Sequence, residues 1–273
     1  MRKEASRSSV ALAAAMVVAT LASRGLPGAG AAELDGFLAA HRKAAEHASA
    51  KQWTAAAKVY GAFAAAHPRD AGASLASFLQ GLTLLRELDQ AAPAREAFAR
   101  AAGGTPTTAL GRAVAQGGRA WLARLQMVQL DAALRKYWVD VVEYPASLDG
   151  VVMRKLVAPE AIVDPWGKPF AYETGRLKLA PDMPRQKYTL RCTAIEGTSR
   201  DLKKFLVATR GFGQGFKVRG IVAGPPRGAN VVTPDGRSAN VAEASKLGTA
   251  TVVTIGLQAV VIADSDNVAV LTR

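Results

Sequence analysis

The spacing of apolar residues divides the chain into a helical first half and a β-rich end. From about residue 32 to 104, alanines and larger apolar residues recur with the period of amphipathic helices. A longer helix is predicted from about Leu110 to Val141. Its apolar positions are spaced so that they share one face, namely Met127, Leu130, Leu134, Tyr137 and Val141. This face needs a sheet or another helix to cover it.

The last third of the sequence changes to short β-branched runs separated by turn residues. We expect strands at 217–222, 229–232, 250–255, 259–263 and 268–272. The Pro-Asp-Gly of residues 234–236 predicts one tight reversal. The apolar stretch 250–263 is too short and too polar for a membrane-spanning helix, and it predicts two strands instead. These patterns predict a small antiparallel barrel or sandwich.

The helical half contains an internal similarity. An offset of 38 residues pairs Ala56 with Ala94, Tyr60 with Phe98 and Pro68 with Pro106. This offset approximates a 34-residue helix-turn-helix period with a short insertion, so residues 32–110 resemble tetratricopeptide repeats. The resemblance implies a concave groove for a peptide or a partner helix, shaped by Trp53, Tyr60 and Phe98. The alternative is a plain alanine-rich helical hairpin with no binding role.

Two repeats are fewer than the three or so that usually suffice for independent stability. We therefore expect the helical segment to stack on the next helix or on a partner.

The first 31 residues have the pattern of a secretory signal peptide, with a basic start, a 13-residue apolar stretch and a small-x-small site ending at Ala31. We expect cleavage near Ala31 and export to the periplasm. The net charge of +13 would then fall to +10, because four basic residues and one acidic residue are removed.

Composition limits the available chemistry. The single cysteine, Cys192, excludes an intramolecular disulfide and a four-cysteine metal site, and we expect it to be buried. The histidines are His41, His47 and His67, all in the helical half, and the first two lack the i, i+4 spacing of a zinc-binding pair. No serine-hydrolase elbow is present. We predict no catalytic residue, no metal and no cofactor.

The middle of the chain carries its most specific motif. After the helical run 130–137, the motif residues are Tyr144, Pro145, Asp164, Trp166 and Gly167. The Tyr-Pro pair must be extended or turning, and the Asp-Pro-Trp-Gly sequence predicts a reversal that buries the indole. In this order and spacing, residues 120–198 resemble the globular domain of the major pseudopilin of type II secretion. The resemblance implies a helix packed on a small antiparallel sheet, with the motif residues shaping the module.

The sequence departs from that family in three places. Pseudopilins polymerise through a hydrophobic amino-terminal helix, and the leader and helical segment occupy that place here. The family often binds calcium near the end of the domain, where this chain has only Glu196, with Asp201 nearby, so no metal site is predicted. Residues 141–143, Val-Val-Glu, replace the usual glycine-containing turn. We do not expect assembly into a pseudopilus by the family's route.

The terminal segment 217–273 resembles the small periplasmic β domain of secretin-partner proteins. The resemblance rests on Gly220-Ile221, on Leu247-Gly248 and on the final apolar strand at 259–262. It implies docking on a secretin, for example through an edge strand. An unrelated small β-barrel would give the same pattern, and this alternative stays open.

The glycine-rich stretch before this segment imitates the start of an aromatic RNA-binding motif, but no second motif of that kind is visible. Residues 201–216 are therefore predicted to be a flexible linker.

These predictions combine into a multidomain α+β chain. The expected parts are a signal peptide (1–31), a tetratricopeptide-like helical domain (32–110), a pseudopilin-like domain (111–200), a linker (201–216) and a small β domain (217–273). The expected function is that of an exported, non-enzymatic scaffold or assembly component of a type II secretion or type IV pilus-like system. Its partners would be secretin or pilin-like subunits. Basic residues are scattered, so nucleic acid is not expected, and the alternative is a basic envelope protein that binds peptidoglycan or anionic lipid.

Overall fold

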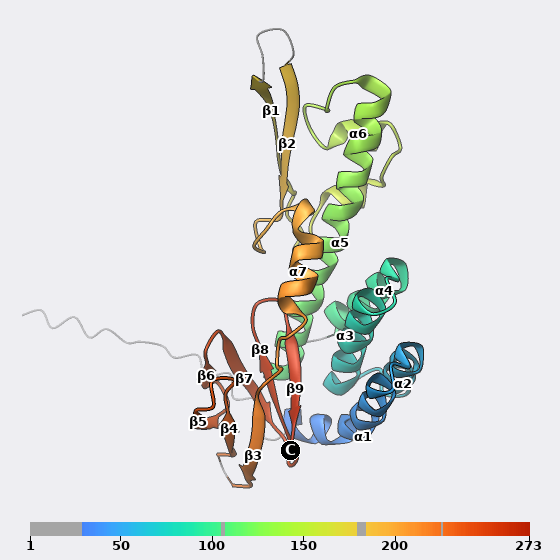
Figure 1. The fold of residues 1–273 in the computed structure, drawn as a ribbon. Coiled ribbons are helices and arrows are strands. Elements are labelled where there is room, and N and C mark those ends of the chain that lie inside the picture. The colour runs from blue at the N-terminus through green and yellow to red at the C-terminus, as the bar shows by residue number, and fades with distance from the viewer. Residues whose placement is uncertain (1–28, 105–106, 179–183, 225) are drawn as a thin grey trace, which may run out of the picture.

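The computed structural model describes residues 29–104, 107–178, 184–224 and 226–273 (Figure 1). The fold is a mixed α+β multidomain arrangement with seven α-helices among the described residues. Most of the expected leader, and Pro106 of the proposed repeat, lie outside those residues. The helices of the first half are α1 (Ala29–Ser49), α2 (Trp53–Ala66), α3 (Ala71–Arg86), α4 (Ala91–Gly103) and α5 (Ala109–Val141).

Consecutive helices of the first half pack against each other, and α5 packs on α4 and α3. The chain reverses at polar caps, because the Asp70 carboxylate accepts a hydrogen bond from Gly72 N at 2.8 Å and begins α3. Glycine permits close approach inside the array, since a Cβ at Gly81 would lie only 2.7 Å from the Phe98 ring. The 38-residue offset relates α2 to α4, with Ala56 and Ala94 both buried. The helical half thus stacks on the following helix, as the sequence predicts.

Helix α5 matches the predicted long helix to within one residue at its start. Three of the five stripe residues, Met127, Leu130 and Leu134, are buried, and the last two are half-buried. The stripe packs in a core shared with a hairpin and two short helices. These are β1 (Ala171–Lys178), β2 (Pro184–Arg191), α6 (Asp149–Met153) and the 3-10 helix η1 (Pro159–Ile162). Strands β1 and β2 form a two-stranded antiparallel sheet.

The β-rich end forms two antiparallel sheets. The first has the order β3 (Lys217–Val222), β4 (Gly228–Val232), β5 (Ser238–Ala242). The second has the order β6 (Lys246–Leu247), β7 (Ala250–Ile255), β8 (Ala259–Ala263), β9 (Val268–Thr272). The five predicted strands are present, and β5 and β6 are additional. Among the described residues, no helix is long and apolar enough to span a membrane.

The segment predicted to be a flexible linker is folded, which corrects that prediction. The 3-10 helix η2 (Ser199–Asp201) ends at the first residue of this segment, and α7 (Leu202–Thr209) lies within it. Leu202, Phe205 and Leu206 share one face of α7 and pack on the core of the helical array. The glycine-rich part continues in tight turns, with Phe212 N donating to Thr209 O at 3.1 Å. Because its apolar residues have a helical spacing, the segment forms a helix with one partly buried face and does not stay extended.

The modules share buried contacts. The core of the helical array also contains residues of three strands of the second sheet, among them Val253, Val261 and Val268. Helix α5 therefore touches the helical array, the hairpin module and the β-rich end. In Figure 1, α6 and the hairpin lie at one end of the molecule, and the strands β3 to β9 lie at the other.

Candidate binding surfaces

Two aromatic residues predicted to shape a binding groove lie in the core. Phe98 is fully buried, and its ring stacks on Trp121 with 5.7 Å between the ring centroids. Tyr60 is also buried, and its hydroxyl lies 3.0 Å from His41 Nδ1. Burial lowers the pKa of His41 to about 4. These two residues lie in the core of the helical array, Phe98 against α5 and Tyr60 against α1, and they do not line an open groove.

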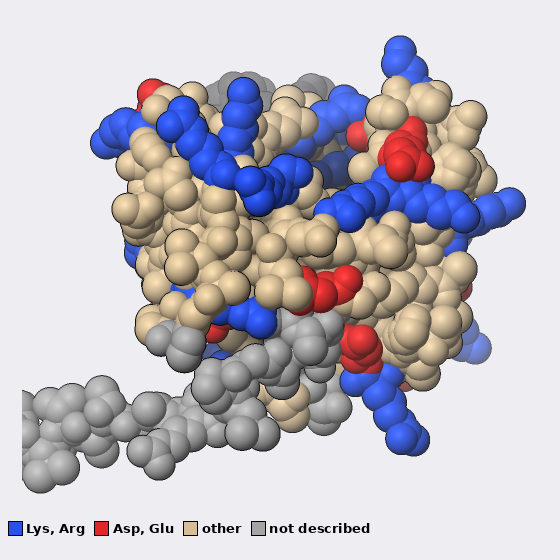
Figure 2. All heavy atoms as spheres, turned by 90° about the horizontal axis from the view of Figure 1, so that it is seen from below, with Lys and Arg blue, Asp and Glu red and all other residues tan. Residues whose placement is uncertain are grey.

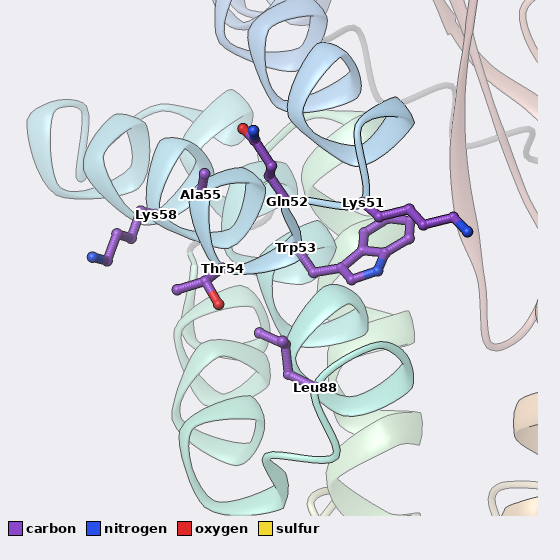
Figure 3. Close-up of a pocket in the computed structure, with 7 residues that line it drawn as sticks. All are labelled: Lys51, Gln52, Trp53, Thr54, Ala55, Lys58 and Leu88. Carbon is purple, nitrogen blue, oxygen red and sulfur yellow. The ribbon is translucent and has the colours of Figure 1, made fainter.

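The third predicted residue, Trp53, is half-buried and borders an open groove (Figure 3). The groove has a volume of about 410 Å³. Leu88, from the segment after α3, points toward the start of α2, where Trp53 lies. The lining residues are Lys51, Gln52, Trp53, Thr54, Ala55, Lys58 and Leu88. We call this site the Trp53 groove.

Two turns in the left-handed backbone region build the Trp53 groove. Lys51 has φ of 56° at the end of α1, and Asp89 has φ of 51° after Leu88. These turns bring the start of α2 beside the segment after α3. The side chain of Gln52 lies 2.8 Å from His47 Nδ1 and does not cap the first turn of α2. The groove therefore combines apolar surface, two lysines and the uncapped amino end of a helix.

The Asp-Pro-Trp-Gly motif forms the predicted reversal. Asp164 is buried, and its Oδ1 accepts hydrogen bonds from Trp166 N and Lys168 N, both at 2.9 Å. Gly167 has φ of 81°, which favours glycine. Cys192 Sγ lies 3.3 Å from Asp164 Oδ2, and burial raises the pKa of this thiol to about 11. Asp164 and Gly167 therefore hold the turn itself, and the buried cysteine stays protonated at neutral pH.

The other three motif residues differ in accessibility. Trp166 is half-buried and donates from Nε1 to Gln116 Oε1 on α5 at 3.3 Å, which corrects the prediction of a buried indole. The residue packs against the edge of the core that α5 shares with the hairpin, so part of it stays exposed. Pro145 is buried, and its carbonyl accepts a hydrogen bond from Tyr172 at 2.9 Å. Tyr144 is half-buried, with its ring 4.7 Å from that of Tyr188.

The last turns of α5 expose a group of large apolar side chains that the sequence analysis did not select. Trp138 is 41% exposed, Val139 70% and Val142 74%. Val142 also has φ of 62°, a left-handed conformation that is unfavourable for a β-branched residue. We call Trp138, Val139 and Val142 the α5 end surface.

Arg124 lies at the junction of the modules. Its guanidinium stacks 3.3 Å from the centroid of the Phe205 ring, and Nη1 donates to Glu196 O at 2.9 Å. Nη2 lies 3.3 Å from Asp266 Oδ1 in an ion pair with side chains 3% and 11% exposed. Trp121 Nε1 donates to the carbonyl of Asp266 at 3.0 Å. Sequence reasoning missed this junction, because its members are far apart in the chain and no local pattern connects them.

Electrostatics at the junction follow from burial. Burial raises the pKa of Asp266 above its ordinary value, and the opposing attraction of Arg124 reduces that rise. Glu196, considered as a calcium ligand, is exposed and contributes a backbone carbonyl to Arg124. Within the described part of the chain, no group of three or more His, Cys, Asp or Glu residues is placed to hold a metal ion.

No protein-family model, no curated protein and no solved structure matches this chain. Its function is therefore inferred from the residues and the geometry described above.

Proposed function

We propose that the chain is an exported, non-enzymatic scaffold or assembly component of a type II secretion or type IV pilus-like system. It acts by binding proteins, with secretin or pilin-like subunits as partners. One observation carries this proposal: two accessible apolar surfaces lie on different modules that the same helix, α5, joins. They are the Trp53 groove and the α5 end surface. A body that holds two such surfaces at a fixed separation suits a spacer between partners.

The middle module supports the resemblance to pseudopilins. Its elements follow the implied order of a long helix, the Tyr144-Pro145 pair, the Asp-Pro-Trp-Gly turn and antiparallel strands. These parts share one core with α5. Since pseudopilin-like domains pack beside related subunits, this order favours a role next to pilus-type proteins. The buried motif residues would act by holding the module in shape.

The exposed aromatic residues suit protein binding. Tryptophan is enriched among the residues that contribute most to protein interfaces, and Trp53 and Trp138 are both accessible. The β-rich end offers a second mode, because β5, like β3, is an outer strand of the three-stranded sheet. An outer strand has backbone groups available to pair with a strand of a partner. This strand is the one we assign to the secretin.

The alternative function is a basic envelope protein that binds peptidoglycan or anionic lipid. It is favoured by charge, since the whole chain carries a net +13. On the face seen in Figure 2, Lys and Arg side chains outnumber Asp and Glu. Attraction of this kind acts over about 10 Å and is screened by salt. Binding through apolar surfaces is much less sensitive to salt, so ionic strength separates the two functions.

The test is crosslinking of the tagged full chain in its native envelope, at low and at high salt. We expect secretin or pilin-like subunits to be recovered in both conditions. The double variant Trp53→Ala/Val139→Ser should lose them. Val207→Ser is the matched control, because Val207 is 77% exposed on α7 and outside both surfaces. Recovery of lipid or peptidoglycan alone, lost at high salt, would reject the scaffold in favour of the envelope protein.

A further inference from the structure

We propose that the Trp53 groove binds an acidic peptide segment of a partner protein, one that carries a large apolar side chain between its acidic residues. The proposal deepens the scaffold function and rests on it, because it names the kind of segment that one of the two surfaces takes. It concerns the groove at the start of α2 and not the buried residues Tyr60 and Phe98.

The apolar part of the groove selects the central side chain. The half-buried residues Trp53 and Leu88, together with Ala55, give it apolar walls. A volume of about 410 Å³ lies within the range of pockets that hold one ligand group, and it accommodates a large aliphatic or aromatic side chain. A partner side chain seated there would cover the exposed part of the Trp53 ring. This provides the apolar contact of the interaction.

The charges at the groove select the flanking residues. Both charged residues that line it are lysines, Lys51 and Lys58, and both are exposed. Figure 3 places them on opposite sides of the start of α2, with their ammonium groups directed outward. An acidic residue on each side of the apolar side chain would therefore meet a lysine. Glu87, next to Leu88, is ion-paired with Arg210 at 2.7 Å and does not line the groove.

This combination favours a peptide over other occupants. A bilayer needs a broad, flat contact, whereas the apolar surface here is confined to one groove. An apolar helix without charge would use the walls and leave both lysines without partners. An extended acidic segment uses both features, with carboxylates on the outside and one apolar side chain inside. The two lysines then determine which segments are accepted.

The test uses the full chain and a fluorescein-labelled nonapeptide pool, Gly-Ser-Glu-Glu-Φ-Glu-Glu-Ser-Gly, in which Φ is Leu, Ile, Met, Phe or Trp. Two comparison probes replace the four Glu by Gln, or Φ by Ala. Fluorescence anisotropy measures the affinity at a fixed, moderate salt concentration. We expect the acidic pool to bind, and both comparison probes to bind about tenfold or more weakly.

Variants locate the binding. Lys51→Glu/Lys58→Glu should lower the affinity for the acidic pool by about tenfold or more, since two attractive contacts become repulsive. Lys203→Glu/Lys204→Glu makes the same change of net charge on exposed residues of α7, away from the groove, and should leave the affinity unchanged. Trp53→Ala should weaken binding with both lysines still present.

The proposal is overturned if the acidic pool does not bind, if the glutamine pool binds equally well, or if the α7 control loses as much affinity as the groove variant. These outcomes are separate from failure of the scaffold function. If the acidic pool does not bind but the unchanged chain still recovers secretin or pilin-like subunits from the envelope, the groove assignment is wrong and the scaffold stands. If the pool binds but no protein is recovered from the envelope, the scaffold function fails.

Discussion

The two ends of α5 differ in their surroundings. From Leu110 to Leu134 the helix is covered by α3, α4, η2, strands of the β-rich end and the hairpin module, and Trp121 is fully buried there. In its last two turns, Trp138 and Val139 are exposed, and the residue that follows the helix, Val142, has an unfavourable conformation. In the first part of the helix, other elements of the protein cover the apolar side chains. At its end Trp138 and Val139 are left exposed, so they are available for a partner.

The comparison separates residues that stabilise the fold from residues that bind. Trp121 and Trp138 stand 17 positions apart on one helix, and the Trp121 indole makes a stacking contact and a hydrogen bond within the protein. Trp138 has one ring contact, with Tyr144 at 6.3 Å. Stability should therefore fall steeply for changes in the first part of α5 and little for changes at its end.

Trp121→Ala should have the largest effect on stability. The indole is fully buried, and its removal leaves a cavity between α4, α7 and the turn before β9, so we expect a loss of about 4 kcal/mol. Urea denaturation followed by circular dichroism measures the change. A loss below about 1 kcal/mol would show that the junction does not join the modules.

Arg124→Met should cost about 3 kcal/mol at pH 7, because it leaves Asp266 charged and poorly solvated. Without Arg124, the already raised pKa of Asp266 rises further. A carboxyl group with a higher pKa in the folded state favours folding below its unfolded pKa, and this contribution is lost as the pH rises through the folded value. The difference from wild type should thus shrink between pH 7 and pH 4. A difference that stays constant would contradict the ion pair.

Trp166→Ala should have an intermediate effect. A half-buried indole loses about half of what a fully buried one does, so we expect about 2 kcal/mol. Thermal unfolding and urea titration of the full chain measure it. A loss as large as that of Trp121→Ala would restore the prediction of a buried indole at this turn.

Val142→Gly should raise the free energy of unfolding by about 1 kcal/mol, since glycine adopts the left-handed conformation without strain. Val139→Gly is the matched control within the helix and should lower it by about 0.5 kcal/mol. Urea midpoints compare the two variants. Equal losses in both would mean that the end of α5 is not strained at Val142.

Trp138→Ala should have the smallest effect, less than about 1 kcal/mol, because Trp138 is 41% exposed and lies at the end of the helix. Its effect on partner recovery from the envelope should nevertheless be clear. A large loss of stability would place Trp138 with the packed part of α5 and remove it from the α5 end surface.

The spacing of apolar residues predicted the helices and strands of this chain well, but it did not predict how deeply individual side chains are buried. The bounds of α5 and the five main strands followed from apolar spacing, and the turn at Asp164 followed from its residue types. The depth of burial did not. Phe98 and Trp53 were both expected in a groove, yet Phe98 is covered by α5 and Trp53 is not. Local sequence shows which face is apolar but not which distant element covers it.

The missed features have a common cause. The junction joins Arg124 with Phe205 and Asp266, which are separated by 81 and 142 positions and have no shared local pattern. Helix α7 was mistaken for a linker because glycines follow it directly, although its apolar face has helical spacing. The Trp53 groove depends on Leu88 from another helical hairpin. Of the residues that line the groove, sequence analysis selected Trp53 alone.

Site-specific photocrosslinking tests the central claim most directly. A photoreactive phenylalanine analogue would replace Trp53, Trp138 or, as a control, Val207 in the full chain in its native envelope. We predict that the first two positions crosslink to proteins at low salt, that the Trp138 crosslinks persist at high salt, and that Val207 crosslinks to proteins at neither. Crosslinks from Trp53 and Trp138 to lipid alone, or the same crosslinks from Val207, would contradict a scaffold with two separate binding surfaces.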